Sequence, residues 1–310
     1  MTQELGYFLQ QLLNTVQLAT FYVPLAVAFA LIQSITRKVF LSFGDVAMFG
    51  SFAAVYVCFA SLVNGYDELP SAIFSLAIAI FCAGAFGNVA AQIIFAPLLK
   101  RSSQAFMIAA IGFSIAIQEL MRLQSGGRDI WIPPLFQGNR VVFWPEPFTL
   151  QITAVTVFSI VLTVASIIGL AVLLKLTRFG RNWQACSQEI RLAKLCGVNT
   201  DAVMRHTFML GAGLAAVSGW ISAISYGGTS FSSGLMLGFK AMFAAVIGGF
   251  GSIRGAVLGA ISLAGLEVLW SATFSTAYRD AFVFSFIVLV LLLRPEGLAG
   301  IGAQRESEKL

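Results

Sequence analysis

Residues 180–198 read GRNWQACSQEIRLAKLCGV, a polar and mixed-charge stretch with long apolar runs on both sides. Because those runs are long enough to cross a membrane, the stretch must lie in a loop between two spans. Gly197, near its end, is a residue that can end a helix without conformational cost. We therefore expect one helix held at the membrane surface, suited to receive force from a soluble partner; a solvated helix without a partner is the alternative.

The rest of the chain has the composition of a membrane protein. Of its 310 residues, 58% are hydrophobic and 11% charged, whereas a soluble domain carries about 25% charged residues. The four cysteines form no disulfide framework and no metal-binding spacing. The net charge of +5 fits basic residues on the cytoplasmic side of a membrane better than nucleic-acid binding. The chain is predicted to be an all-α polytopic transmembrane bundle, with residues 1–310 as one domain.

Apolar runs of about 20 residues mark the spans. The runs at 236–250 and 255–270 are short, which favours broken or re-entrant helices there. About nine spans are expected, with eight to ten as the range, near 11–36, 42–63, 71–96, 104–123, 150–174, 203–226, 236–250, 255–270 and 281–293.

Basic residues set the orientation. Fourteen of the 19 Lys and Arg residues fall in one set of loops, which the positive-inside rule places in the cytoplasm. The N-terminus is then outside and the C-terminus cytoplasmic. The segment 176–202 becomes a cytoplasmic coupling segment, and 124–149, with four prolines and two tryptophans, becomes an external loop, either a docking surface or simply an interfacial loop.

Ionisable residues inside spans are costly and are therefore candidate functional groups. Asp45 follows Gly44 at the start of the second run, and Lys240 interrupts the seventh. The two could face each other, either as a structural ion pair or as contacts for the charged ends of an amino acid. Glu267 requires a partner that the sequence does not reveal, and Glu119 is expected to pair with Arg122 three residues on.

Polar and small residues supply further candidates. Gln17 is a candidate for lining a translocation path, with hydrogen bonding between helices as the alternative. The similar surroundings of Asp45 and Lys240 hint at an internal duplication. No metal site is expected, since His206 is the only histidine and has no ligand cluster around it. Glycines expected to form a tight turn or a gate, or to let helices approach closely, are Gly248, Gly249, Gly251, Gly255 and Gly259.

Two runs carry a family resemblance. GRNWQACSQEIRLAKLCGVNTDAVMRHTF, from Gly180, resembles the coupling segment of permease subunits of branched-chain amino-acid ABC importers. LGFKAMFAAVIGGFGSIRGAVLGA, residues 237–260, resembles the same family more specifically, and further similarity extends over nearly the whole chain. One departure is Leu41-Ser42-Phe43, where the family usually has Asn-Phe-Ala-His; a different substrate would follow if those groups touch it.

The resemblance implies a transport subunit, not an enzyme, in a bacterial cytoplasmic membrane. Its partners would be a sister permease subunit, two cytoplasmic ATPase subunits and a periplasmic or extracellular binding protein. The chain has no phosphate-binding G-x-x-x-x-G-K-[ST] loop, so ATP and magnesium would be used by the partners and no cofactor is expected here. The residues implied in coupling to the ATPase are Arg181, Ala185, Glu189, Arg191, Ala193, Lys194, Leu195 and Gly197.

Branched-chain or related amino acids are the expected cargo. A urea or short-amide importer is the alternative within the class, because its permeases resemble the same family. An ion-gradient secondary transporter is the alternative from another class, since it would need no ATPase partner.

Overall fold

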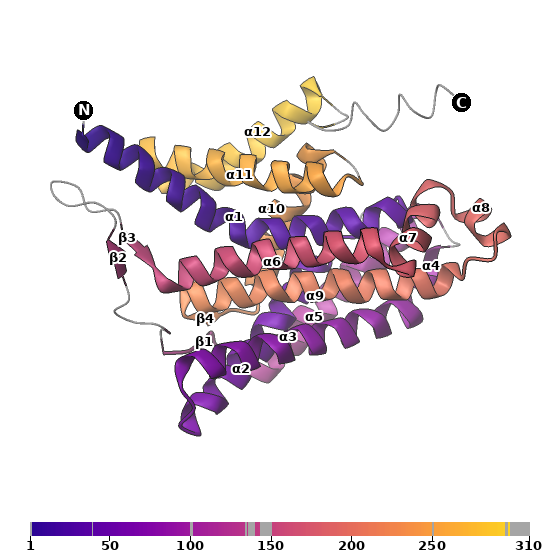
Figure 1. The fold of residues 1–310 in the computed structure, drawn as a ribbon, viewed down its shortest axis with the longest axis horizontal. Coiled ribbons are helices and arrows are strands. Elements are labelled where there is room, and N and C mark those ends of the chain that lie inside the picture. The colour runs from indigo at the N-terminus through magenta and orange to yellow at the C-terminus, as the bar shows by residue number, and fades with distance from the viewer. Residues whose placement is uncertain are drawn as a thin grey trace.

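The computed structural model describes residues 2–38, 40–99, 102–133, 135, 140–142, 151–249, 251–294 and 297. It is a bundle of roughly parallel and antiparallel helices with two small strand pairs (Figure 1). The helices are α1 (Thr2–Thr36), α2 (Phe43–Val63), α3 (Glu68–Ala90), the π-helical turn η1 (Ala91–Phe95), α4 (Ala96–Leu99), α5 (Ser103–Ser125), α6 (Ala154–Leu176), α7 (Arg178–Gln188), α8 (Ile190–Leu195), α9 (Thr200–Tyr226), α10 (Ser233–Gly248), α11 (Ile253–Thr273), the 3-10 turn η2 (Thr276–Tyr278) and α12 (Arg279–Leu293).

The strands lie together at one end of the bundle, which we call the strand end. There β1 (Ile130–Trp131) pairs antiparallel with β4 (Gly228–Thr229), and β2 (Arg140–Val142) pairs antiparallel with β3 (Gln151–Thr153). Helices α7 and α8 lie at the opposite end, which we call the α7–α8 end (Figure 1). Much of the expected external loop 124–149 lies outside the described residues; its described part includes β1 and β2.

Eight helical segments in the described chain are long and apolar enough to cross a membrane, which confirms the predicted all-α polytopic class. The prediction of a short helix at 255–270 is wrong, because α11 has 21 residues. Helix α10 is short as expected, with 16 residues; at 1.5 Å per residue it reaches about 24 Å, less than the hydrocarbon core.

The short helix nevertheless changes the direction of the chain. It begins just after β4 at the strand end, and the turn that follows it brings Gly251 against Ser34, near the α7–α8 end of α1. Helix α11 returns to the strand end, where the Ala272 carbonyl accepts a hydrogen bond from the Tyr7 hydroxyl of α1. Together with the eight membrane-length segments, α10 gives the described chain nine passes between the two ends. Helix α1 therefore begins and α12 finishes at opposite ends of the bundle (Figure 1).

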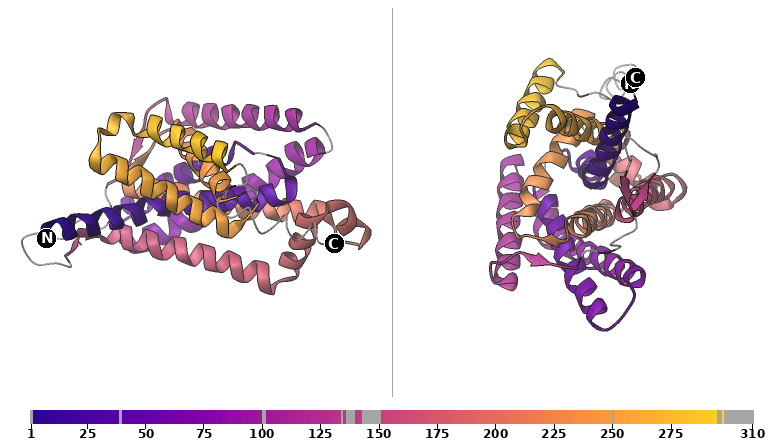
Figure 2. Two further views of the ribbon diagram at one scale, coloured as in Figure 1. Left: turned by 90° about the horizontal axis from the view of Figure 1, so that it is seen from above. Right: turned by 90° about the vertical axis from the view of Figure 1, so that its left-hand side faces the viewer.

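Helices α1 and α9 form the centre of the bundle and are buried along most of their length. Ser218 of α9 donates to the Phe21 carbonyl of α1, and the Trp220 indole donates to Ser75 of α3 at 2.9 Å. Helices α5, α6 and α12 lie at the periphery of the bundle (Figure 2). Many of their large apolar side chains are exposed. These faces suit lipid or a second membrane subunit.

Helices α2 and α10 cross at two glycines. A Cβ added to Gly44 would lie 2.5 Å from the Gly238 Cα, and one added to Gly238 would lie 2.7 Å from the Gly44 Cα. The two glycines also occupy the same place when the Ala-Met-Phe triplets at 47–49 and 241–243 are aligned. The reciprocal contact fits the internal duplication suggested by the sequence, which stays a prediction.

Candidate functional site

Four charged side chains meet near the strand end of the bundle. Lys240 Nζ of α10 lies 2.7 Å from Glu267 Oε1 of α11 and 2.8 Å from Asp280 Oδ1 of α12. Arg279 Nε of α12 approaches the same Glu267 oxygen at 3.0 Å, although without the alignment of a hydrogen bond. The hydroxyl of Tyr22 on α1 donates to Glu267 Oε2 at 2.7 Å. We call these five residues the charge cluster.

The charge cluster is neutral, with two cations and two anions. Glu267 is only 1% exposed, yet both of its oxygens are engaged, and Lys240 is also buried. Removing such charges from water is costly unless they are paired and hydrogen-bonded, and this arrangement meets that requirement. The cluster consequently links α1, α10, α11 and α12 at one point.

Two adjoining hollows border the charge cluster. One, of about 390 Å³, lies among α1, α9, α11 and the start of α12. The other, of about 410 Å³, reaches from the cluster to β1 and β4. Tyr226, Glu267 and Arg279 line both hollows. Each volume is in the range of sites for small molecules.

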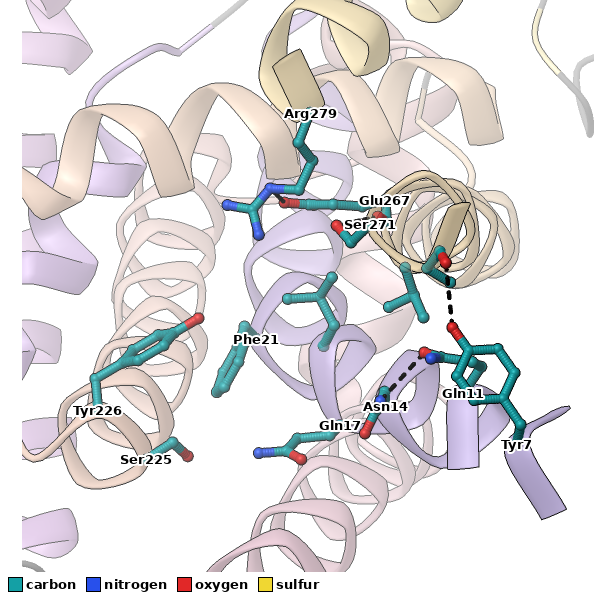
Figure 3. A pocket seen from close by; sticks show the side chains of 13 residues that line it. Tyr7, Gln11, Asn14, Gln17, Phe21, Ser225, Tyr226, Glu267, Ser271 and Arg279 are labelled. Carbon is teal, nitrogen blue, oxygen red and sulfur yellow. Dashed lines mark hydrogen bonds and ion pairs between the residues drawn. The ribbon is translucent and has the colours of Figure 1, made fainter. Parts of the chain in front are cut away.

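Polar side chains of α1 form one wall of the first hollow (Figure 3). Asn14 donates to the Gln11 side chain at 3.2 Å, and Tyr7 donates to the Ala272 carbonyl at 3.2 Å. Gln17 lies deeper, and its amide has no hydrogen-bond partner in the described chain. With Phe21 alongside, the wall combines hydrogen-bonding groups with apolar surface, which suits a small polar solute with an apolar part.

The prediction that Asp45 and Lys240 face each other is wrong. Lys240 pairs with Glu267 and Asp280, while Asp45 accepts hydrogen bonds from two residues of α5, Ser114 and Gln118, the latter at 2.7 Å. Asp45 has no ion-pair partner among the described residues, and its carboxylate is satisfied by neutral donors and by its place in the first turn of α2. The expected pair of Glu119 and Arg122 is confirmed.

The four residues expected to line a path fall in two places. Lys240 and Gln17 line the hollows. Gly44 packs against α10, and Asp45 is buried against α5, so neither lines these two hollows. Contact between these four residues and the cargo stays a prediction.

The departure at Leu41-Ser42-Phe43 also concerns buried packing. Ser42 donates to the Ala110 carbonyl at 2.5 Å, and Phe43 packs edge-on against Phe29 and Phe40. Neither Ser42 nor Phe43 lines the two hollows.

The candidate glycines form the turn between α10 and α11 and the packing that follows it. Gly249 and Gly251 have φ of +108° and +77°, a region that other residues rarely adopt. A Cβ on Gly248 would overlap the Gly255 carbonyl, and one on Gly259 would overlap the Ala244 carbonyl. The expected tight turn and close helix approach are therefore present; a gating role stays a prediction.

The predicted coupling segment, 176–202, forms two helices, α7 and α8, so the expected single helix is wrong. Glu189 separates α7 from α8, and its backbone is extended (φ −152°, ψ 110°). Part of the segment's surface packs inward, because Trp183, Cys186 and Ala193 are buried. Arg37 also donates to the Gln188 carbonyl at 2.8 Å, which fixes α7 to the end of α1.

Other parts of the segment remain exposed. Leu192 is 61% and Leu195 83% exposed. Gly197 follows the end of α8 and has a φ of +83°, as expected for a residue that ends a helix. Burial raises the pKa of the Cys186 thiol, which makes it less reactive. Ala185 is half-buried, and the remaining exposed candidates are Arg181, Glu189, Arg191 and Lys194.

Three members of the charge cluster were missed from the sequence. Arg279 and Asp280 stand just before the last apolar run, where charges ordinarily mark the end of a span. The available signal was Glu267, which lies in the preceding apolar run and needed a partner that the sequence had not supplied. Nothing in the sequence identifies Tyr22, which lies 245 residues from Glu267.

A bundle of membrane-length helices around a polar, charge-lined hollow is the architecture of a transport permease. A family model described as "Branched-chain amino acid transport system / permease component" matches residues 11–293. The chain belongs to this family, as the resemblance in the sequence predicted.

Several curated relatives agree. The chain is 36% identical to the high-affinity branched-chain amino acid transport system permease protein LivH of Escherichia coli (strain K12), over 97% of this chain and 98% of LivH. It is 31% identical to BraD of Pseudomonas aeruginosa, a protein of the same description, over 96% and 97%. The autoinducer 2 import system permease protein LsrC of Salmonella paratyphi B is more distant, at 28% over 80% of this chain and 69% of LsrC.

Proposed function

We propose that this chain is a membrane subunit of a binding-protein-dependent ABC importer that carries branched-chain or related amino acids inward. The observation that carries the proposal is the arrangement of two features on the same helices. The charge-lined hollows lie toward the strand end. The exposed leucines of α7 and α8 belong to helices that lie at the opposite end of the bundle (Figure 1). Such a separation allows one end to admit solute while the other receives force.

The orientation follows from the charge bias of the loops. The α7–α8 end carries the basic segments and is cytoplasmic, so the strand end faces outward and α12 finishes inside. ATP bound by two partner subunits closes them, α7 and α8 move with them, and the spans alternate between outward and inward access. A binding protein delivers cargo to the strand end, and a sister permease completes the path.

The identity to LivH and BraD supports an amino acid as cargo, because both are described as branched-chain amino acid permeases. The hollow adds chemical support, since it presents both charges and apolar surface. A urea or short-amide importer is the alternative within the class. It would not need charged groups at the hollow, because its cargo is neutral.

Docking is tested at the two exposed leucines. The double change Leu192→Asp and Leu195→Asp should abolish co-purification of the ATPase subunits while membrane insertion stays normal, because charge replaces the apolar contact. This change avoids Trp183, whose burial makes deletion of 182–196 disruptive to the fold itself. Gln124→Asp, an exposed change on α5 at the strand end and away from α7 and α8, is the control. Normal co-purification after the double change would contradict docking at this surface.

Cargo and energy source are tested by uptake of labelled leucine and labelled urea in cells with and without the gene. Gene-dependent leucine uptake that survives an uncoupler but stops on ATP depletion supports the proposal. Urea uptake instead would keep the importer and change its cargo. Uptake that collapses with the uncoupler while ATP is maintained would support a secondary transporter.

A further inference from the structure

We infer that Arg279 binds the α-carboxylate of the cargo as it passes the hollows, an inference that rests on the proposed function. Arg279 is the first residue of α12 and lines both hollows, so any solute that moves between them passes its side chain. A residue at this junction is placed to select among solutes that the binding protein releases.

The charge cluster leaves this one cation available. Lys240 is held between Glu267 and Asp280 at 2.7 and 2.8 Å, and Tyr22 takes the second oxygen of Glu267. Arg279 contributes only its Nε, at 3.0 Å from Glu267 and 3.6 Å from Asp280. Within the described residues its two terminal nitrogens have no hydrogen-bond partner, and its side chain is 39% exposed.

The free nitrogens have the right geometry for a carboxylate. A guanidinium presents two parallel N–H donors that match the two oxygens of a carboxylate, and such charge-assisted pairs are the strong ones. The hydroxyl of Tyr226 and the amide of Gln17 extend into the same hollow from α9 and α1 and are also without partners in the described chain (Figure 3). They can donate to the same anion.

The neighbouring surface suits the remainder of an aliphatic amino acid. Leu18, Phe21 and Val268 line the first hollow beside these donors, so a branched side chain can contact apolar groups while its carboxylate reaches Arg279. Urea and short amides have no carboxylate, and the hollow would leave the Arg279 donors unpaired against them. The site therefore discriminates between the two cargo classes independently of the binding protein.

The test uses the complete complex in liposomes and measures leucine delivered per ATP hydrolysed. Arg279→Gln should lower this ratio about tenfold or more, the effect of losing one charge-assisted hydrogen bond, while ATP hydrolysis persists. The ratio for Arg279→Lys should lie between those of Arg279→Gln and the wild type, because an ammonium offers charge without the two parallel N–H donors of a guanidinium. Arg122→Gln, in the ion pair with Glu119 that lines neither hollow, is the matched control and should behave as wild type.

A second variant separates carboxylate binding from a structural role. If Arg279 only balances Glu267, the charge-balanced double change Arg279→Gln and Glu267→Gln should restore transport; the inference predicts that it does not. Restoration, or a wild-type ratio in Arg279→Gln, would overturn the inference. Should Arg279→Gln fail to assemble, Arg279→Lys decides alone: a lowered ratio supports the inference, and a wild-type ratio overturns it. A wild-type complex that carries no leucine would instead refute the proposed function.

Discussion

Glu267 should be the member of the charge cluster on which stability depends most. It is 1% exposed and is approached by Tyr22, Lys240 and Arg279 at 2.7, 2.7 and 3.0 Å. Glu267→Gln keeps an oxygen for Tyr22 but leaves one uncompensated positive charge in the cluster. Breaking a buried pair by removing one partner costs about 3–5 kcal/mol, and we expect a loss of unfolding free energy of that size.

Asp280→Asn is the matched comparison. Asp280 also pairs with Lys240, at 2.8 Å, but its side chain is 42% exposed. Water screens such a pair, so its loss should cost about 1 kcal/mol or less. The same neutralisation of a carboxylate, a few ångströms away, thus has a much smaller predicted effect.

Equilibrium unfolding in mixed detergent micelles measures the unfolding free energy of both variants and of a third, double variant. In the double variant Glu267→Gln and Lys240→Met, the loss should be smaller than the sum of the two single losses by about 0.5–3 kcal/mol, because the two residues interact directly. Equal losses for Glu267→Gln and Asp280→Asn, or strict additivity in the double variant, would refute the view that Glu267 holds the cluster together.

Two further predictions test packing and orientation. Gly44→Ala places a Cβ 2.5 Å from the Gly238 Cα and should destabilise the bundle by about 1–3 kcal/mol. Gly112→Ala, with open space around its Cβ, is the control and should leave the unfolding free energy unchanged. Equal unfolding free energies of the two variants would contradict the close crossing of α2 and α10. A membrane-impermeant maleimide should label exposed Cys196 only from the cytoplasmic side. It should label Cys186 only after denaturation, because Cys186 is buried and burial also raises its thiol pKa. Labelling of Cys196 from outside would reverse the proposed orientation.

Much of the fold could be predicted from the sequence because a bilayer imposes one simple requirement. A span needs about 20 apolar residues with its backbone bonded internally, and α2, α5, α6 and α9 meet it plainly. The turn at Gly249 and Gly251 and the helix end at Gly197 were also readable, since each requires a positive φ. Family-specific runs then identified the class of protein.

The charge cluster could not be predicted because its contacts are non-local. Lys240, Glu267 and Asp280 come from three helices, and span hydropathy gives no information on which helix faces meet. The pairing of Asp45 with Lys240 was chosen on charge alone, although hydrogen bonds from Ser114 and Gln118 satisfy Asp45 equally well. The break at Glu189 was also missed, because neither proline nor glycine marks it.

In the proposed mechanism, ATP on the α7–α8 side drives amino acids inward through the charge-lined hollows. Leucine accumulation in liposomes that contain the complete complex and an external binding protein tests it most directly, with ATP either enclosed or added outside and with all ion gradients absent. Complexes whose α7–α8 end faces the lumen should accumulate leucine only when ATP is enclosed. Accumulation without ATP on imposing a proton or sodium gradient, or none with enclosed ATP, would contradict the account.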